Sequence, residues 1–332
     1  MMKNLAMLMI LLAFGWAGYW VLGSWRVEKN FDRWFEDRRN DGWVAEYDDL
    51  AILGFPNRFD TTFTNLTLTA PDASMAWAMP FFQLFTLSYR PNHIIVVWPP
   101  KQTFTTPLEE LTLQTDNMRA SFVFHPETEL TLNRANISVN KLNLKSTRNW
   151  QLGADNLSLA VYQQEGQSAS YRIALRAQDV ASPLANPLFS GIGLPKALSA
   201  LEVDLTAKFD RTWTRRAVEH ARPQLTQINL ALAEISLGDL GLVMNGDITI
   251  DKAGYPNGNI NIRAVNWREI VSIARDSPQV SPSITKAIND ALNLVAQLSG
   301  TANTIEFSLT FSDRFMRIGP ITIAPAPVIK LR

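Results

Sequence analysis

The chain has 332 residues, and its 31 Lys and Arg balance its 31 Asp and Glu, so the formal net charge is zero. Charged residues make up only 19% of the chain, below the roughly 25% typical of soluble domains. The balanced charge offers no basic surface for a nucleic-acid backbone, so no nucleic-acid partner is expected. Because the chain has no cysteine, disulfides and thiol chemistry are excluded.

The first segment, Leu5 to Leu22, contains neither charge nor proline (LAMLMILLAFGWAGYWVL). About 18–20 apolar residues in an α-helix span the ~30 Å hydrocarbon core of a bilayer. Aromatic rings, which favour the headgroup layer, gather at its distal end: Trp16, Tyr19, Trp20 and Trp25. We therefore interpret residues 1–25 as a single transmembrane anchor.

A cleaved signal peptide is the alternative for this segment. A signal peptide has a basic start, a 7–15-residue apolar stretch and small residues at its cleavage site. Here the apolar stretch is longer and ends in bulky aromatics, which favours retention. Arg26, Lys29 and Arg33 follow the segment while Lys3 alone precedes it. This charge bias argues weakly for a cytoplasmic domain, but long domains translocate largely regardless of such charges.

Residues 26–41 are expected to form a membrane-proximal amphipathic helix. Apolar side chains recur at helical spacing, at Val27, Phe31, Trp34 and Phe35, and Asp41-Gly42 ends the pattern. The segment is too poor in basic residues for a membrane-surface helix. Its apolar face is therefore expected to pack on the following domain.

From residue 42 onwards the hydrophobic period changes to two. Alternation of apolar with Thr, Asn, Ser, Asp or Lys side chains is typical of antiparallel strands with one apolar face. The clearest runs include Phe59–Phe63, Ile137–Val139, Leu157–Val161, Leu201–Leu205 and Ile305–Phe311. The predicted fold is mainly β: a long antiparallel curved sheet or an open barrel-like groove, with a few helices.

Helical spacing returns near the C-terminus. Asn266 to Asp276 and Ser281 to Ser299 are predicted helices, the second with a serine N-cap followed by proline. The Pro- and Gly-rich stretch from Ser182 to Leu198 is the expected boundary between a first β half, 42–181, and a second, 182–332. The two halves could also form one continuous domain.

No catalytic or metal-binding signature is present. Nucleophile-elbow, zinc-protease, P-loop and dinucleotide-binding motifs are all missing. The three histidines, His93, His125 and His220, are isolated in the sequence. Asp247 and Asp251 share one face of a predicted strand, where a solvated face is favoured over acid–base or calcium chemistry. We expect no enzyme activity, no cofactor and no metal.

The stretch from Met75 to Leu87 is unusually apolar and is interrupted by Pro80. It is either a pair of core strands or an exposed surface for acyl chains, because monomeric proteins rarely expose such a patch without a use. On the second interpretation, Phe81, Phe82 and Phe85 line an apolar groove.

A short turn motif, Gly54-Phe55-Pro56-Asn57-Arg58, precedes a strand, and a similar unit recurs at Gly254-Tyr255-Pro256-Asn257. With the N-terminal anchor, the short helix and the one-sided strands, this motif resembles an uncharacterised family of alpha-proteobacterial envelope proteins. More distantly, the arrangement is similar to the AsmA-like superfamily. The residues that carry the resemblance are Gly54, Phe55, Pro56 and Arg58.

The resemblance implies an inner-membrane anchor, a periplasmic β-rich domain and a role in lipid or outer-membrane homeostasis. Two functional hypotheses follow. The first is a non-enzymatic protein that binds lipid or another apolar ligand in a β groove and supports the envelope. The second is a scaffold with a filled β core that recruits a protein partner.

Overall fold

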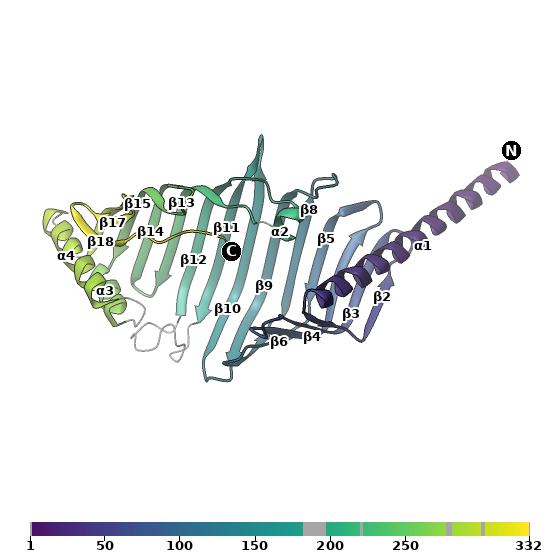
Figure 1. Cartoon of the computed structure of the whole chain (residues 1–332), viewed down its shortest axis with the longest axis horizontal. Coiled ribbons are helices and arrows are strands. Elements are labelled where there is room, and N and C mark those ends of the chain that lie inside the picture. Colours follow the sequence, from purple (N-terminus) through teal and green to yellow (C-terminus); the bar gives the residue numbers. More distant parts are fainter. Residues whose placement is uncertain (1, 182–196, 220–221, 277–280, 300–302, 332) are drawn as a thin grey trace. The chain divides into compact units, whose positions relative to one another are not determined.

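The computed structural model describes residues 2–181, 197–219, 222–276, 281–299 and 303–331. This part of the chain forms eighteen strands and four helices (Figure 1). The strand pairings within each of the two units described below are antiparallel. The predicted fold class, mainly β with a long antiparallel sheet, a few helices and an apolar N-terminal helix, is confirmed.

Contacts divide the chain into two compact units. The N-terminal unit comprises Met1–Val123 and Ser146–Arg148, and the C-terminal unit comprises Phe124–Lys145 and Asn149–Arg332. The expected boundary, Ser182 to Leu198, lies outside the described residues as far as residue 196, and its last two residues begin β12 (Ala197–Phe209).

The N-terminal unit contains α1 (Met2–Asn40) and eight strands. Their bounds are β1 Val44–Glu46, β2 Asp49–Leu53, β3 Arg58–Thr69, β4 Ala76–Leu87, β5 Arg90–Trp98, β6 Lys101–Thr105, β7 Glu110–Gln114 and β8 Asn117–Phe124. Strand β3 pairs with β1, β2 and β4, strand β4 pairs with β5 and β6, β5 pairs with β8, and β6 with β7.

Helix α1 is a single helix, so the segments predicted as 1–25 and 26–41 are continuous. It ends at a glycine cap: Gly42 has φ +86°, its N–H donates to the Arg39 carbonyl at 3.0 Å, and Trp43 N–H donates to the Arg38 carbonyl at 3.0 Å. A left-handed glycine with these two bonds satisfies carbonyls that a helix end leaves free. Among the described helices, α1 alone is long and apolar enough to cross a membrane, and its most apolar window is not buried within the protein.

The C-terminal unit is a meander in which each of ten strands pairs with the next in sequence. The strands are β9 Leu132–Ser146, β10 Gln151–Gln164, β11 Gln167–Ala181, β12 Ala197–Phe209, β13 Leu225–Leu237, β14 Leu240–Ile250, β15 Pro256–Val265, β16 Thr304–Ser312, β17 Phe315–Ile318 and β18 Ile321–Pro325. Among the described strands, β9 and β18 do not pair with each other, so this sheet is open.

Three helices accompany that sheet: α2 Arg215–Glu219, α3 Trp267–Asp276 and α4 Pro282–Ser299. Both predicted C-terminal helices are therefore present, and Ser281 caps α4 through its hydroxyl, which accepts from Ile284 N–H at 3.4 Å. Helix α3 packs on β14, and α4 packs on β16, β17 and β18. The core there includes Trp267, Ala291 and Ile305, each only 1% exposed.

The C-terminal segment after β18 returns across the same unit. Ile329 N–H donates to the Gly254 carbonyl at 2.8 Å, and Leu331 exchanges two hydrogen bonds with the Gln224 side chain at 2.8 and 3.0 Å. Leu331 and Ile329 pack beside Phe209 and Ile250 respectively. In Figure 1 this segment is the yellow trace that ends at the label C.

Candidate functional site

The N-terminal unit contains an apolar cavity of about 310 Å³ between α1 and the sheet. Its walls are almost entirely hydrocarbon and aromatic: Asn30, Phe31, Trp34 and Phe35 of α1, Phe63, Leu66 and Leu68 of β3, and Phe82 and Leu84 of β4. Phe31 meets Phe63 edge-on at 5.1 Å between ring centroids. The amphipathic face of the helix packs on the strands, as its spacing predicts.

Backbone conformation decides which side chains reach this cavity. Asn65 has φ +49°, and this left-handed residue shifts the alternation of β3 by one position. Phe63 on one side of it, and Leu66 and Leu68 on the other, therefore join one hydrophobic cluster.

The three phenylalanines singled out in the sequence do not share one surface. Phe82 pairs with Phe63 and lines the cavity. Phe81 and Phe85 pair with Thr64 and Asp60 and lie on the opposite face of β4, because successive strand residues alternate between faces. The cavity thus takes only Phe82 from the predicted set, and its other walls come from α1 and β3.

The turn motif joins β2 to β3. Gly54 has φ +100°, and a Cβ placed there would lie 2.9 Å from Arg58 Cβ, so a larger residue would be strained. Arg58 N–H donates to the Gly54 carbonyl at 2.9 Å, the Phe55–Pro56 peptide is cis, and the Arg58 guanidinium pairs with Asp60 at 2.5 Å. Phe55 contacts Trp20 of α1 edge-on at 5.6 Å. The motif shapes a turn that meets the helix.

The C-terminal unit carries a larger apolar surface, which we call the apolar face. Three rows of residues cross eight paired strands from β9 to β16, and every residue in them is apolar or, at Gly246, a glycine. The first row is Ile137, Leu159, Leu175, Val203, Ala233, Met244, Ile262 and Phe307; the second is Val139, Leu157, Ala177, Leu201, Ile235, Leu242, Ala264 and Ile305; the third is Ala135, Val161, Ile173, Leu205, Leu230, Gly246, Ile260 and Leu309.

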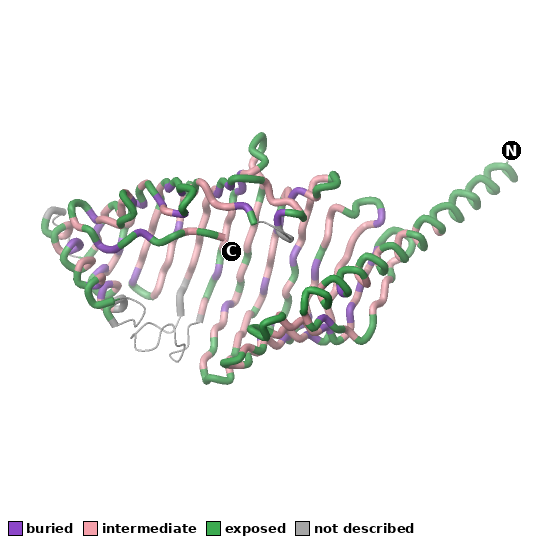
Figure 2. The backbone as a smooth tube through the Cα atoms, viewed as in Figure 1, coloured by how far each residue is buried: buried purple, intermediate pink, exposed green. Residues whose placement is uncertain are grey.

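Burial varies along these rows. At β15 and β16, where the helices pack, Ala264 and Ile305 are 3% and 1% exposed. On β10 to β13 the large aliphatic side chains, such as Leu159, Leu175 and Val203, are only partly buried. Figure 2 shows these central strands largely in the intermediate colour. Among the described residues, the middle of the apolar face is therefore a hydrocarbon surface without the close cover found at its α3–α4 end.

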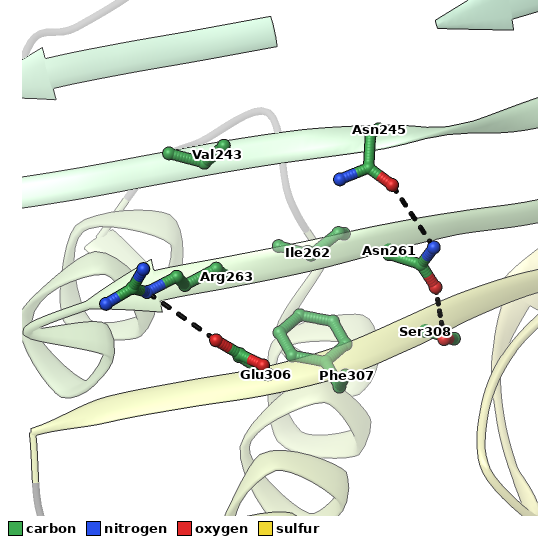
Figure 3. Close-up of a pocket in the computed structure, with 8 residues that line it drawn as sticks. All are labelled: Val243, Asn245, Asn261, Ile262, Arg263, Glu306, Phe307 and Ser308. Atoms are coloured by element: carbon green, nitrogen blue, oxygen red, sulfur yellow. Dashed lines mark hydrogen bonds and ion pairs between the residues drawn. The ribbon is translucent and has the colours of Figure 1, made fainter. Parts of the chain in front are cut away.

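The opposite face of the same strands is polar, and its side chains bind one another. In Figure 3, Asn261 Nδ2 donates to Asn245 Oδ1 at 3.2 Å, Ser308 Oγ donates to Asn261 Oδ1 at 2.7 Å, and Arg263 lies 3.6 Å from Glu306. These residues line an open, mixed cavity of about 410 Å³. The amide and hydroxyl groups of this cavity hydrogen-bond to one another. The cavity therefore presents a ladder of paired polar side chains and no reactive pair.

The same pattern continues on β11 and β12. Arg172 binds Asp204 through two hydrogen bonds of 2.9 and 2.5 Å. The hydrogen bonds from the Arg172 guanidinium lower the pKa of the Asp204 carboxyl, and partial desolvation opposes this effect. Asp247 likewise accepts a hydrogen bond from Asn229 at 2.7 Å. These carboxylates therefore belong to a solvated polar face whose side chains hydrogen-bond to one another.

Side chains that could hold a metal are not gathered together in the part of the chain described. Within it, no group of three or more His, Asp or Glu residues could hold a metal ion. His93 Nε2 lies 2.9 Å from Ser121 Oγ, and His125 Nε2 lies 2.7 Å from Gln163 Oε1. His220 lies outside the described residues.

The sequence interpretation missed two contributors to these surfaces. Strand β11 was not singled out, although Ile173, Leu175 and Ala177 alternate with Arg172 and Arg176, a period-2 signal like that of its neighbours. Contacts between the aromatic end of α1 and the β-turns were also missed, because no local pattern encodes them.

Together, the fold and these surfaces define a class: a β-sheet protein with a membrane-compatible N-terminal helix and a two-sided sheet, polar on one face and apolar on the other. The chain belongs to the bacterial family described as "Uncharacterized protein conserved in bacteria (DUF2125)", whose model matches residues 20–327. No curated protein and no solved structure gives a significant match.

Proposed function

We propose that this protein is a non-enzymatic, membrane-anchored envelope protein that binds lipid, or another ligand with acyl chains, on the apolar face of its C-terminal unit. The large domain lies in the periplasm, tethered to the inner membrane by α1. Similarity to the AsmA-like superfamily and an alpha-proteobacterial origin belong to this proposal and rest on the turn motif and the order of elements.

The observation that carries the proposal is the apolar face itself. Three apolar rows cross eight strands without one polar interruption, and their large side chains on β10 to β13 stay partly exposed. Burying apolar surface is worth about 25 cal/mol per Å², so leaving this surface in water is costly. Acyl chains would cover it without any polar partner, and the face offers none.

The anchor is supported by the geometry of α1. Trp16, Tyr19 and Trp20 lie within or at the end of the apolar segment and contact the sheet turns through hydrogen bonds of 2.7 Å. Removal of the segment as a signal peptide would delete these contacts, which favours its retention as an anchor.

Lipid extraction followed by mass spectrometry of the detergent-purified full chain tests the binding surface. Leu175→Lys places a charge in the middle of the apolar face, between Leu159 and Val203. Ala174→Lys is the matched control, because Ala174, the preceding residue of the same strand, pairs with Asp204 and faces the polar side. Lipid around α1 is common to both variants, so their difference reports the face alone.

We expect Leu175→Lys to lower the lipid content per chain while Ala174→Lys retains it, with the same far-UV circular dichroism in both. Equal lipid content in the two folded variants would contradict binding on the apolar face. That outcome would favour the scaffold hypothesis, in which a protein partner covers the surface.

A further inference from the structure

One end of the N-terminal unit is joined to the apolar part of α1. Trp16 Nε1–H donates to the Pro56 carbonyl, Trp20 Nε1–H to the Arg58 carbonyl and Tyr19 O–H to the Ser88 carbonyl, each at 2.7 Å. The β2–β3 and β4–β5 turns are themselves linked, since Ser88 N–H donates to the Asn57 carbonyl at 2.9 Å. These two linked turns form what we call the turn end of the unit.

Helix length places the turn end relative to a bilayer. The part of α1 that precedes Trp16 is Met2–Gly15, which at 1.5 Å per residue is about 20 Å long. A bilayer core is about 30 Å thick. A spanning α1 must therefore place Trp16 to Trp20 inside the membrane or at its boundary, and the turns bonded to them must lie at the same depth.

The chemistry of the turn end suits that depth. Leu53, Phe55 and Tyr89 are large apolar or aromatic side chains that are 67%, 58% and 57% exposed. Two arginines lie beside them on neighbouring strands, since Arg58 and Arg90 are both register partners of Leu87; Arg58 also forms an ion pair with Asp60. Apolar and aromatic side chains with adjacent guanidinium groups match the acyl–headgroup boundary, where rings partition and phosphates accept guanidinium hydrogen bonds.

The other end of the same strands differs. Strand β3 runs from Arg58 to Thr69, about 36 Å at 3.3 Å per residue. The connection beyond it contains Asp72, whose carboxylate accepts a hydrogen bond from Ser74 N–H at 3.0 Å. That end lies well outside the boundary layer when the turn end lies within it.

We propose that the turn end, with Leu53, Phe55 and Tyr89 at its tip, is a membrane-insertion surface that sits in the acyl–headgroup boundary of a phospholipid bilayer. This rests on the proposed anchoring by α1. It adds a second membrane contact, so that the sheet of the N-terminal unit starts inside the boundary layer and not at the end of a free stalk.

Single-cysteine labelling tests this, because the chain has no native cysteine. The full chain is reconstituted in phosphatidylethanolamine–phosphatidylglycerol vesicles with an environment-sensitive fluorophore at Leu53→Cys, Tyr89→Cys, Ser74→Cys or Leu11→Cys. Quenching by lipids brominated on their acyl chains then reports depth. Ser74 is exposed at the far end of the sheet, and Leu11 lies within the apolar part of α1.

We expect the labels at Leu53 and Tyr89 to emit further to the blue than the label at Ser74 and to be quenched, as the label at Leu11 is. If both behave like Ser74 while Leu11 is quenched, the insertion surface is overturned and the anchor stands. If Leu11 is not quenched either, the anchor and the insertion surface both fall.

Discussion

At the residue scale, two glycines allow β14 and β15 to pair closely. Gly246 has φ +150°, and a Cβ there would lie 2.1 Å from the Asn259 carbonyl oxygen; at Gly258, with φ +139°, a Cβ would lie 2.2 Å from the Asp247 carbonyl oxygen. Both obstacles are backbone atoms of a paired strand, which cannot move aside as a side chain can. These positions therefore require glycine for conformation and for space.

We predict that Gly246→Ala destabilises the protein by about 2–4 kcal/mol, the sum expected from backbone strain and overpacking. Gly241→Ala on the same strand is the control, because its Cβ would meet only Val265 side-chain atoms at 3.5 Å and its φ is not positive. Chemical denaturation of the two variants measures the difference. Similar midpoints for both would show that the strand pair adapts and that the close approach is not essential.

At the scale of elements, helix α4 is the main cover of one end of the apolar face. Leu292 of α4 is 4% exposed, whereas Leu294, two residues later, is 40% exposed. A buried leucine cut to alanine leaves a cavity and loses transfer free energy, which together cost about 2–5 kcal/mol.

We predict a loss in that range for Leu292→Ala and a loss of less than about 1 kcal/mol for Leu294→Ala, since surface changes are mostly small. The two substitutions alter helix propensity equally, so thermal or urea unfolding isolates burial. An equal loss in both variants would mean that α4 is not held to the sheet by its apolar stripe.

Elements with a strong local signal were predictable from the sequence. The apolar run of Leu5–Leu22, the serine-proline start of α4 and the period-2 alternation of β10 and β12 each follow from spacing alone. The apolar cavity of the N-terminal unit was not predictable. Its walls depend on the left-handed Asn65 and on which residues of β3 face α1, and both are set by pairing between segments distant in sequence.

The phenylalanines of β4 show the same division. The sequence identified the apolar stretch, but strand alternation separates Phe82 from Phe81 and Phe85. The three phenylalanines could line one groove only if this segment were helical or irregular. The regular pairing of β4 with β3 excludes that. Likewise, the aromatic side chains near the end of the anchor were interpreted as headgroup contacts alone, while three of them also bind the turn end.

At the scale of the whole molecule, the sheet of the C-terminal unit separates two kinds of surface. Hydrogen-bonded amides, hydroxyls and ion pairs occupy one face, and hydrocarbon occupies the other. Polar side chains that bind one another are already satisfied within the sheet, whereas the proposed lipid would cover the partly exposed apolar face. This asymmetry favours the apolar face, and not the polar ladder, as the surface for the proposed function.

We predict that the domain lies on the periplasmic side of the membrane. Charge near α1 does not decide it, because a large domain translocates largely regardless of flanking Lys and Arg. With no native cysteine in the chain, Ser74→Cys in the exposed connection after β3 reports the domain, and Asn4→Cys reports the opposite flank of the anchor. A membrane-impermeant maleimide is applied to intact spheroplasts. A periplasmic domain gives labelling at Ser74→Cys before lysis and at Asn4→Cys only after lysis. The reverse pattern would place the domain in the cytoplasm, and an apolar face there would have to draw its lipid from the inner leaflet of the same membrane.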